Sequence, residues 1–547
     1  MRRLVAGISA TVLIAASAAA ATTVATADPS QPAAVCSGAT CTTTYGASAA
    51  IATFTVPSFV TQLAVTVDGA EGGRLRGKGG TSKPGGLGGQ TTLDAAVAPG
   101  DVLSVIVGGS GGDIEQFSPG TSGGAGGYAG GASGGSSGGQ IPATGGGGGS
   151  FVFFANGLLM AAAGGGGGRS VTGVGGSGGG GVTGFVGGVG GDGSDSATGG
   201  QPGTGVIGGD GAGGAGTSQG ASQGSPGTGE VNGPSTLPVG GAGGSGGYGG
   251  GGGGGGSHSG GGGGSDNNAS MDASSGGGGG GGSGYYDGAL TTDVSGGAGV
   301  VSGNGSVSIA YAKGGTDITA SVQPRSLSAT VAPVTAGAVT PTGTVSFAVD
   351  GEGVGSAPLV DGVATLTDTV PVGATHHIDV TYTGDDNYLG SSGSAVRSDP
   401  TITATLHSAK PASRYHWYRR PVTVTFRCQA TTGAIQNCPK TATLRRNGAR
   451  QTLSRTVTAA DGGAAMVTVA GINIDQVKPK VVIRGPKNGA VYHHKPPKAR
   501  CVAHDPLSGV AKCVIHKRDL AARNLLIATA TDKAGNVAHA RLKYRRG

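Results

Sequence analysis

Short runs of alternating apolar and polar residues predict β-strands in the first part of the chain. FTVPSFVTQLAVTVDGA (54–70) and QTTLDAAVAPGDVLSVIVGG (90–109) are bounded by Gly, Pro and Asp, and GNGSVSIAYA (303–312) has the same character much later. Successive side chains of a strand point to opposite faces, so such runs are typical of half-buried strands. Because they lie on both sides of the intervening tract, we expect one sheet closed from both ends.

An apolar hairpin is predicted inside that tract. In SFVFFANGLLMAAAGGGGG (150–168), the runs Phe151 to Ala155 and Leu158 to Ala163 are joined by Asn156-Gly157. This dipeptide suits the positive φ angles of a tight hairpin turn. A linker without structure would not need such a segment.

Glycine dominates residues 72–311, which hold 97 of the 123 glycines of the 547-residue chain. Fixing a glycine costs roughly 0.5–1 kcal/mol more than fixing an alanine. Either the tract stays flexible, or backbone hydrogen bonds replace side-chain burial in a glycine-rich packing. The embedded hairpin and the flanking strands favour the packing, and the absence of a Gly-X-Y period excludes collagen.

The order of these motifs resembles the glycine-rich β-domain of bacterial surface proteins and phage tail fibres. It is also similar to the glycine-rich region of anaplastic lymphoma kinase. The resemblance covers residues 45–311 and implies a jelly-roll-like sandwich, from which bundles of left-handed polyglycine helices emerge. Residues 170–238 depart from pure glycine toward Gly/Ser/Thr/Val mixtures.

A ladder of short strands follows in residues 318–396. Turn signals stand at Asp350-Gly351, Asp361-Gly362 and Gly384-Asp385, at the spacing of a β-sandwich. PTGTVSF, LVDGVATLT and YTGDDNYLGS closely resemble the repeat of the bacterial Ig-like domain family. The resemblance implies an extracellular spacer or adhesive module without an active site.

Two further small β-modules are expected at 400–475 and 478–547, opening on PTITATL and PKVVIRG. Asn447-Gly448 and Asp461-Gly462 indicate hairpins. The motifs DPLSGVAKC and ATDKAGNVAHARL resemble loops and final strands of Ig-like modules in exported actinobacterial proteins. The fold class predicted for the whole chain is therefore all-β and multidomain, with a glycine-rich jelly-roll-like domain followed by Ig-like β-sandwich modules.

The N-terminus predicts export. Residues 1–27 combine basic residues, a small-residue apolar run and the Ala-Thr-Ala cleavage pattern before Asp28, as a signal peptide does; a retained anchor is the alternative. Residues 28–44 are expected to be a linker. No other run approaches the roughly 20 apolar residues that span a bilayer. We expect a secreted or extracellular protein, or one held at the cell wall by non-covalent contacts.

Six cysteines fall into three local pairs in this oxidising context. Although six cysteines allow 15 pairings, proximity favours disulfides within each pair, and the alternation of Val422, Val424, Phe426 and Cys428 places that cysteine on a buried face. Zinc is the competing interpretation, but no C-x-x-C occurs. The expected disulfides are Cys36 with Cys41, Cys428 with Cys438, and Cys501 with Cys513.

Charge separates the two parts of the chain. Residues 401–547 contain 26 Lys and Arg against 5 acidic residues, a net charge of +21, whereas residues 1–400 carry −14. A basic block of this kind favours polyanions at low salt, and the expected partners are cell-envelope polyanions or extracellular glycans and proteins. An ordinary solvated surface is the alternative. SRYHWYRR (413–420) places aromatic rings beside basic residues, but no recognised nucleic-acid motif occurs, so no specific nucleic acid is expected.

No catalytic residue is expected. GGRLRGKGG (72–80) nearly spells a phosphate loop, but Gly79 stands where Ser or Thr must bind magnesium. Residues 120–124 fit G-x-S-x-G without the strand–turn–helix context that a nucleophile needs. His258 is the only histidine of the glycine-rich tract. We therefore expect no enzyme and no cofactor.

Metal ligation has weak candidates. Neighbours on a strand point to opposite faces, so His376-His377 and His493-His494 could each supply one ligand only. Asp385-Asp386-Asn387 and the pair Asp505 and Asp532 could bind calcium between modules, although the spacing is not that of an EF-hand. The favoured expectation is no metal site.

These observations predict a secreted or cell-surface structural or adhesion protein whose basic C-terminal modules associate with anionic envelope polymers. A specific adhesin that uses loops of the glycine-rich domain is the alternative, and an enzyme is a third. The ligand and the oligomeric state stay open.

Overall fold

The protein is all-β in the part that the structure, a computed structural model, describes. The described residues are 31–77, 82–115, 122–136, 142–154, 157–168, 277–368, 370–520 and 523–547, with the shorter pieces 189, 199–202, 225–227, 234, 237, 239–245, 254–256, 261 and 263–264. They contain strands and no helix, so the predicted all-β, multidomain fold class is confirmed. The predicted signal peptide (1–27) and most of residues 170–285 lie outside them.

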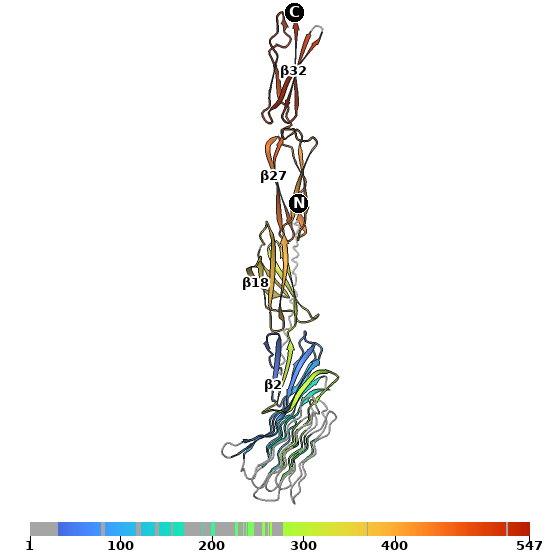
Figure 1. The fold of residues 1–547 in the computed structure, drawn as a ribbon, viewed down its shortest axis with the longest axis vertical. Helices are drawn as coiled ribbons and strands as arrows, with labels where there is room; N and C mark the ends of the chain where they lie inside the picture. Colours follow the sequence, from blue (N-terminus) through green and yellow to red (C-terminus); the bar gives the residue numbers. More distant parts are fainter. Residues whose placement is uncertain are drawn as a thin grey trace, which may run out of the picture. The chain divides into compact units, whose positions relative to one another are not determined.

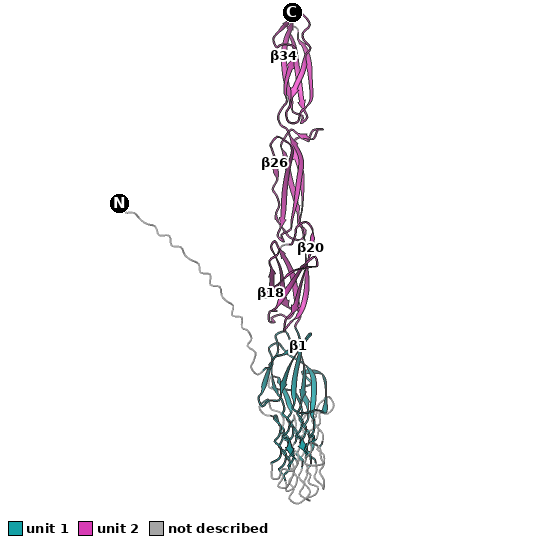
Figure 2. Cartoon of the chain, turned by 90° about the vertical axis from the view of Figure 1, so that its left-hand side faces the viewer, with its two compact units in different colours: residues 1–313 teal, residues 314–547 magenta. Residues whose placement is uncertain are grey.

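The chain divides into two compact units, residues 1–313 and residues 314–547 (Figure 2). Unit 1 contains the glycine-rich tract and its flanking strands. Unit 2 contains the Ig-like segment and the basic C-terminal residues. Among the described residues, no helix has the length and apolar character required to cross a bilayer.

Unit 1 has two main sheets and a small third one (Figure 1). The six-stranded sheet runs in the order β1 (Val35–Ser37), β2 (Thr40–Gly46), β14 (Ser306–Ala312), β4 (Gln62–Asp68), β7 (Gly88–Ala96) and β13 (Thr291–Val301). The five-stranded sheet runs β12 (Tyr285–Tyr286), β11 (Gly157–Ala162), β10 (Ser150–Phe154), β8 (Val102–Ile106) and β3 (Ala52–Thr55). The third sheet contains β6 (Ser82–Lys83), β5 (Leu75–Arg76) and β9 (Ile114–Glu115).

The alternating runs form strands as the pattern predicts. Leu63, Val65 and Val67 on β4 are completely buried, and β14, which follows the glycine tract, pairs with β4 and β2, which precede it. The expectation of one closed sheet is wrong, because β3 and β8 belong to the second sheet. The two sheets bury one apolar core that includes Phe54, Leu103 and Met160.

The apolar hairpin is confirmed with a small correction. Strands β10 and β11 pair antiparallel, and Phe154 lies opposite Gly157. Gly157 is thus the first residue of β11 rather than a turn residue. Residues 155 and 156 lie outside the described part of the chain.

The described glycine stretches pack through their backbones. Gly165 N donates to Ala70 O, Gly147 N donates to Gly165 O at 2.8 Å, and Gly256 N donates to Gly147 O at 2.9 Å. These stretches run alongside one another beyond the strands of the two sheets (Figures 1 and 2). A Cβ at Gly165 would stand 1.8 Å from Gly86 O, so only glycine fits there.

Unit 2 begins with a seven-stranded β-sheet arrangement. Its order is β15 (Thr316–Gln323), β16 (Ser326–Pro333), β19 (Val363–Leu366), β18 (Glu352–Val360), β17 (Thr344–Val349), β20 (Thr375–Gly384) and β21 (Leu389–Ser398). The turns follow the sequence signals: Asp350, Gly351, Asp361 and Gly362 all have positive φ, as tight hairpin turns require. The core contains Phe347, Ile378, Val380 and Tyr382.

Residues 401–475 form two small sheets. One contains β22 (Thr401–Ser408), β24 (Val422–Gln429) and β26 (Ala442–Leu444); the other contains β23 (Trp417–Tyr418), β28 (Ala464–Ile474), β27 (Gly448–Ala459) and β25 (Ile435–Asn437). Asp461-Gly462 closes the β27–β28 hairpin, whereas the hairpin predicted at Asn447-Gly448 is wrong, because β26 and β27 belong to different sheets.

Residues 478–547 form the last pair of sheets. They contain β29 (Lys480–Arg484) with β31 (Arg500–His504), and β30 (Val491–Tyr492), β34 (Val537–Arg546), β33 (Arg523–Asp532) and β32 (Val510–Leu520). The buried core here is small and centres on Leu526, Leu542 and Tyr544. Such small cores leave a module marginally stable unless another constraint is added.

Disulfides supply that constraint. The structure forms Cys36–Cys41, Cys428–Cys438 and Cys501–Cys513, the three local pairs named from the sequence. Val422 and Val424 are fully buried, as the alternation on β24 predicts, while Cys428 is only half-buried. The two C-terminal disulfides each join neighbouring parts of a module with a small core.

Candidate functional site

Basic residues line two clefts of unit 2. The first, which we call the junction cleft, has a volume of about 380 Å³. It is lined by Lys410, Arg419, Arg420, Gln476, Lys478, Gly535, Asn536 and Val537. Four of these eight residues are cationic and none is acidic. Arg419 Nη1 donates to Gly535 O at 3.2 Å, which ties residues 401–475 to residues 478–547 at the cleft wall.

The second, which we call the terminal cleft, has a volume of about 470 Å³. It is lined by Asn488, Gly489, Val491, Arg523, Lys543, Tyr544 and Arg545. Strands β33 and β34 supply the three cations from adjacent positions of one sheet. The absence of any acidic lining residue in either cleft makes both of them electropositive.

Acidic residues of the same region are withdrawn from the surface. Of the five acidic residues in 401–547, Asp475, Asp505 and Asp532 are buried, with 0%, 7% and 1% exposure. One carboxylate oxygen of each lies within 4.8 Å of those of the other two. At an effective dielectric constant of about 20, two unit charges at that distance repel by roughly 3 kcal/mol. Burial raises the pKa of Asp532, hydrogen bonds from Asn536 oppose this, and the neighbouring charges of Asp475 and Asp505 raise it further.

Backbone and side-chain donors hold this acidic cluster in place. Asp505 Oδ1 accepts from Leu507 N and Gly509 N. Asn536 Nδ2 donates to Asp532 Oδ2 at 2.9 Å and to the carbonyl oxygen of Asp475 at 2.8 Å. The cluster therefore connects the end of β28 with the loops after β31 and β33.

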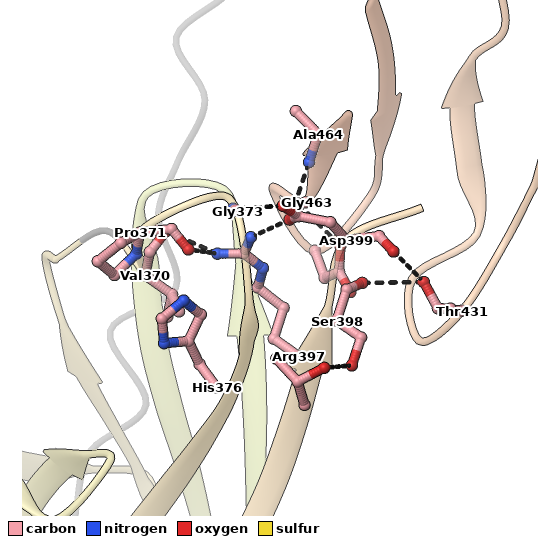
Figure 3. A network of polar contacts seen from close by, with 12 residues as sticks. Val370, Pro371, Gly373, His376, Arg397, Ser398, Asp399, Thr431, Gly463 and Ala464 are labelled. Atoms are coloured by element: carbon pink, nitrogen blue, oxygen red, sulfur yellow. Dashed lines mark hydrogen bonds and ion pairs between the residues drawn. The ribbon is translucent and has the colours of Figure 1, made fainter. Parts of the chain in front are cut away.

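A second polar network lies where the Ig-like segment meets residues 401–475 (Figure 3). Arg397 is 1% exposed, and its Nη1 donates to Val370 O and to Pro371 O. Its Nη2 pairs with Asp399. Asp399 also accepts from Gly373 N and from Ala464 N. Burial alone would raise the pKa of Asp399, but these hydrogen bonds and the guanidinium of Arg397 hold it below its ordinary value.

The histidine pairs do not form a metal site among the described residues, whose only group of three possible ligands is the acidic cluster. His376 Nδ1 lies 2.6 Å from Asp350 Oδ2, and His377 N donates to Asp350 Oδ1. These contacts, with that to His377 as the larger cause, lower the pKa of Asp350. His493 and His494 are exposed.

Asp385 has a structural role in its loop. Its Oδ1 accepts from Asn387 N and Tyr388 N, and its Oδ2 accepts from the backbone and hydroxyl of Thr342. Burial would raise the pKa of Asp385, but these donors lower it overall. The candidate calcium loop at 385–387 thus presents a carboxylate that backbone donors already surround.

The other motifs take ordinary places in the fold. Arg74 pairs with Glu71 and Arg76 with Asp113 around the short strand β5, and Lys78 and Gly79 lie outside the described residues. Ser122 is exposed in a segment without regular secondary structure, while residues 120 and 121 are not described. In SRYHWYRR, Tyr418 packs against the core of residues 401–475, and Arg414 stacks over Tyr415 at 4.8 Å.

Sequence reasoning missed Asp475, Arg397 and Asp399. Arg397 follows Ser391, Gly393 and Ala395 in the inward-facing register of β21. An arginine in that register is a signal of a buried polar contact. Asp475 follows the buried Ile472 and Ile474 at a module boundary, but its partners lie 30 and 57 residues further along the chain, so no local pattern reveals them.

Comparisons with known proteins support one part of the chain. Two solved structures show low similarity to this chain. A protocadherin gammaB7 EC3-6 cis-dimer is 11% identical, with 38% of this chain and 70% of that chain covered and a TM-score of 0.15. The fibronectin(III)-like modules of Clostridium thermocellum CbhA are 10% identical, with 42% of this chain and 94% of that chain covered and a TM-score of 0.13. These TM-scores are too low to support an argument. A search of curated proteins finds no match.

The family model of the bacterial Ig-like domain (group 3) matches residues 314–400. This confirms the resemblance proposed from PTGTVSF, LVDGVATLT and YTGDDNYLGS. The resemblance of residues 45–311 to glycine-rich surface domains stays a prediction. Residues 314–400 are thus similar to the bacterial Ig-like domains of group 3.

Proposed function

We propose that this protein is a non-enzymatic structural or adhesion protein outside the cell, whose C-terminal residues attach to anionic envelope polymers. An Ig-like domain and disulfides are typical of extracellular proteins. The attachment is the part that rests on charge and geometry in residues 401–547.

One observation carries the proposal: cations line both clefts, while three of the five acidic residues of the region are buried together. The accessible charge is therefore more strongly positive than the net charge of +21 suggests. Flexible polymers of repeating phosphodiesters or uronates would meet several cations at once. Each exposed ion pair contributes about 0.2–1 kcal/mol, so the affinity comes from many weak contacts.

The non-enzymatic part is also a proposal. The described residues of the motifs that suggested nucleotide binding or nucleophilic catalysis lie in the short strand β5 or in segments without regular secondary structure, and none is at the start of a helix. The two clefts contain cations and amides but no paired acid and base. Such a lining favours binding of an anion over its chemical conversion.

The experiment compares co-sedimentation of the full chain with isolated Gram-positive cell walls and with purified poly(glycerol phosphate). The cleft variant carries Lys410→Gln, Arg420→Gln and Lys478→Gln, all exposed lining residues. Because three ion pairs are removed, we expect a loss of affinity of roughly 3-fold to 100-fold.

The matched control carries Arg427→Gln, Lys440→Gln and Arg446→Gln, which remove the same charge from exposed positions outside both clefts. We expect this control to lose less affinity than the cleft variant. Equal losses of affinity in the two variants would show that binding depends on the total charge and not on the clefts. No binding by the unaltered chain at low salt would refute the attachment.

A further inference from the structure

Three buried aspartates from distant parts of the chain meet beside the junction cleft. Asp475 follows β28, Asp505 follows β31, and Asp532 ends β33. Their nearest carboxylate oxygens lie within 4.8 Å of one another. Every side chain in the cluster is more than nine-tenths buried, so water screens the three charges poorly.

The cluster has no cationic partner among the residues that the structure describes. The ion pairs there involve other acidic residues, and no Lys, Arg or His nitrogen comes within 4.0 Å of these three carboxylates. The Lys533 side chain passes near Gly509 without pairing with the cluster. Buried charges of one sign normally need a counter-charge or a metal ion.

A second observation points to a ligand. Asp505 Oδ2 is buried and accepts no hydrogen bond, although Oδ1 of the same carboxylate accepts from the backbone of Leu507 and Gly509. A buried oxygen without a donor forfeits its hydration. The fold thus orients Asp505 through one oxygen and leaves the other available.

We propose that Asp475, Asp505 and Asp532 bind one calcium ion at the junction of residues 401–475 and 478–547. All candidate ligands are oxygens, which suits a hard divalent cation and not a metal that prefers imidazole or thiolate. Calcium takes 6–8 oxygens in a flexible arrangement, whereas magnesium demands a near-ideal octahedron. Three carboxylates from three separate segments match the flexible requirement better.

Calcium at this position would join two modules. Asp475 belongs to the end of one module, whereas Asp505 follows β31 and Asp532 ends β33 in the next. Asn536 already crosses the same boundary, since its Nδ2 donates to the carbonyl oxygens of Asp475 and Val477. The ion would hold these segments together through charge, in addition to the amide contacts.

The first experiment uses the unaltered full chain and calcium chloride, with a chelator as the reference. We measure hydrogen exchange by mass spectrometry from about 0.1 to about 10 mM calcium, the range of extracellular calcium modules. At a calcium concentration of about ten times the dissociation constant, hydrogen exchange through an opening that releases the ion should slow about tenfold. We expect this protection in peptides covering residues 475–477, 505–509 and 532–536.

Three results of this experiment would overturn the proposal. One is unchanged exchange at every calcium concentration, and another is protection confined to residues 385–387. An equal response to magnesium chloride would refute the assignment to calcium.

The second experiment is isothermal titration calorimetry, in which calcium chloride is added to the full chain and to the Asp505→Asn variant. Asparagine keeps an oxygen acceptor for the loop but removes the charge. We expect the unaltered chain to bind calcium with a stoichiometry that includes this site. The Asp505→Asn variant should bind one equivalent of calcium less. Asp519→Asn is the control, because Asp519 is exposed and pairs with Lys517. An unchanged stoichiometry in a folded Asp505→Asn variant would refute the site. If that variant does not fold, the hydrogen-exchange data on the unaltered chain are the test of the site.

Discussion

Arg397 and Asp399 form an ion pair at the end of the Ig-like domain, and each also binds a different part of unit 2 (Figure 3). Arg397 reaches the carbonyls of Val370 and Pro371 within the domain. Asp399 reaches the backbone of Ala464 in the β27–β28 hairpin of the next module. The pair therefore connects the end of the Ig-like domain with the module that follows it.

Arg397→Gln should destabilise unit 2. The substitution leaves the carboxylate of Asp399 without its cation, and breaking a buried pair in this way costs about 3–5 kcal/mol. We expect a loss of about 3 kcal/mol, since Asp399 keeps its two backbone donors. Urea unfolding of the full chain measures it, and Arg325→Gln, at an exposed turn, is the control. A loss as small as that of the control would contradict the role of Arg397.

Asp399 should make stability depend on acid pH. Burial alone would raise its pKa, but hydrogen bonds from Gly373, Arg397 and Ala464 lower it overall from an ordinary value of 3.8. Because the pKa in the folded state is lower, this stabilisation is complete above the unfolded value and is lost as pH falls through the folded one.

The corresponding measurement is the unfolding free energy of unit 2 at neutral pH and at successively lower pH. The Asp399→Asn variant should be less stable at neutral pH, and its stability should fall less steeply below about pH 4. Parallel pH curves for the variant and the unaltered chain would show that Asp399 does not contribute to this dependence.

Gly165→Ala should destabilise unit 1. A Cβ there would stand 1.8 Å from Gly86 O, and backbone atoms cannot move aside as a flexible side chain can. Overpacking typically costs about 1–3 kcal/mol and occasionally more. Gly46→Ala is the matched control, because nothing lies within 4 Å of its Cβ. Equal unfolding midpoints for the two variants would refute backbone-to-backbone packing at Gly165.

Removal of the last disulfide should destabilise the C-terminal module. Cysteines 501 and 513 are 12 residues apart, and a loop of about that length contributes roughly 3 kcal/mol. The module has only a small buried core, so we expect the double variant Cys501→Ala, Cys513→Ala to show early loss of protection in residues 478–547 during urea unfolding. The double variant Cys36→Ala, Cys41→Ala, in the other unit, should leave that region unchanged. Equal protection of residues 478–547 in both double variants would contradict the role of the last disulfide.

The sequence predicted local features of the fold well. Alternation in residues 54–70 predicted a half-buried strand, and Leu63, Val65 and Val67 form its buried row. The Asp-Gly pairs at 350 and 361 identified tight turns. These features depend on the backbone preferences of neighbouring residues. The Asn447-Gly448 hairpin failed because the choice between two sheets depends on packing and not on the dipeptide.

Contacts between residues that are far apart in the chain could not be predicted from the sequence. Gly165 and Gly86 carry no side chain whose type could indicate their neighbour, so the packing partner of each glycine depends on the whole arrangement. Asp505 and Asp532 could be suggested as calcium ligands from their loops, but Asp475 joins them only because two modules meet. The charge difference between the two parts of the chain could be counted from the sequence, whereas the two clefts that some of these cations line became apparent only from the fold.

The central claim is that the basic C-terminal residues attach this protein to anionic polymers, and its most direct test is the salt dependence of binding. The measurement is the equilibrium affinity of the full chain for purified poly(glycerol phosphate) across a salt series. Displacement of counterions by several cations predicts a fall of roughly 10-fold to 100-fold between about 50 and about 200 mM salt. An affinity that does not change with salt, or no affinity at low salt, would contradict the account.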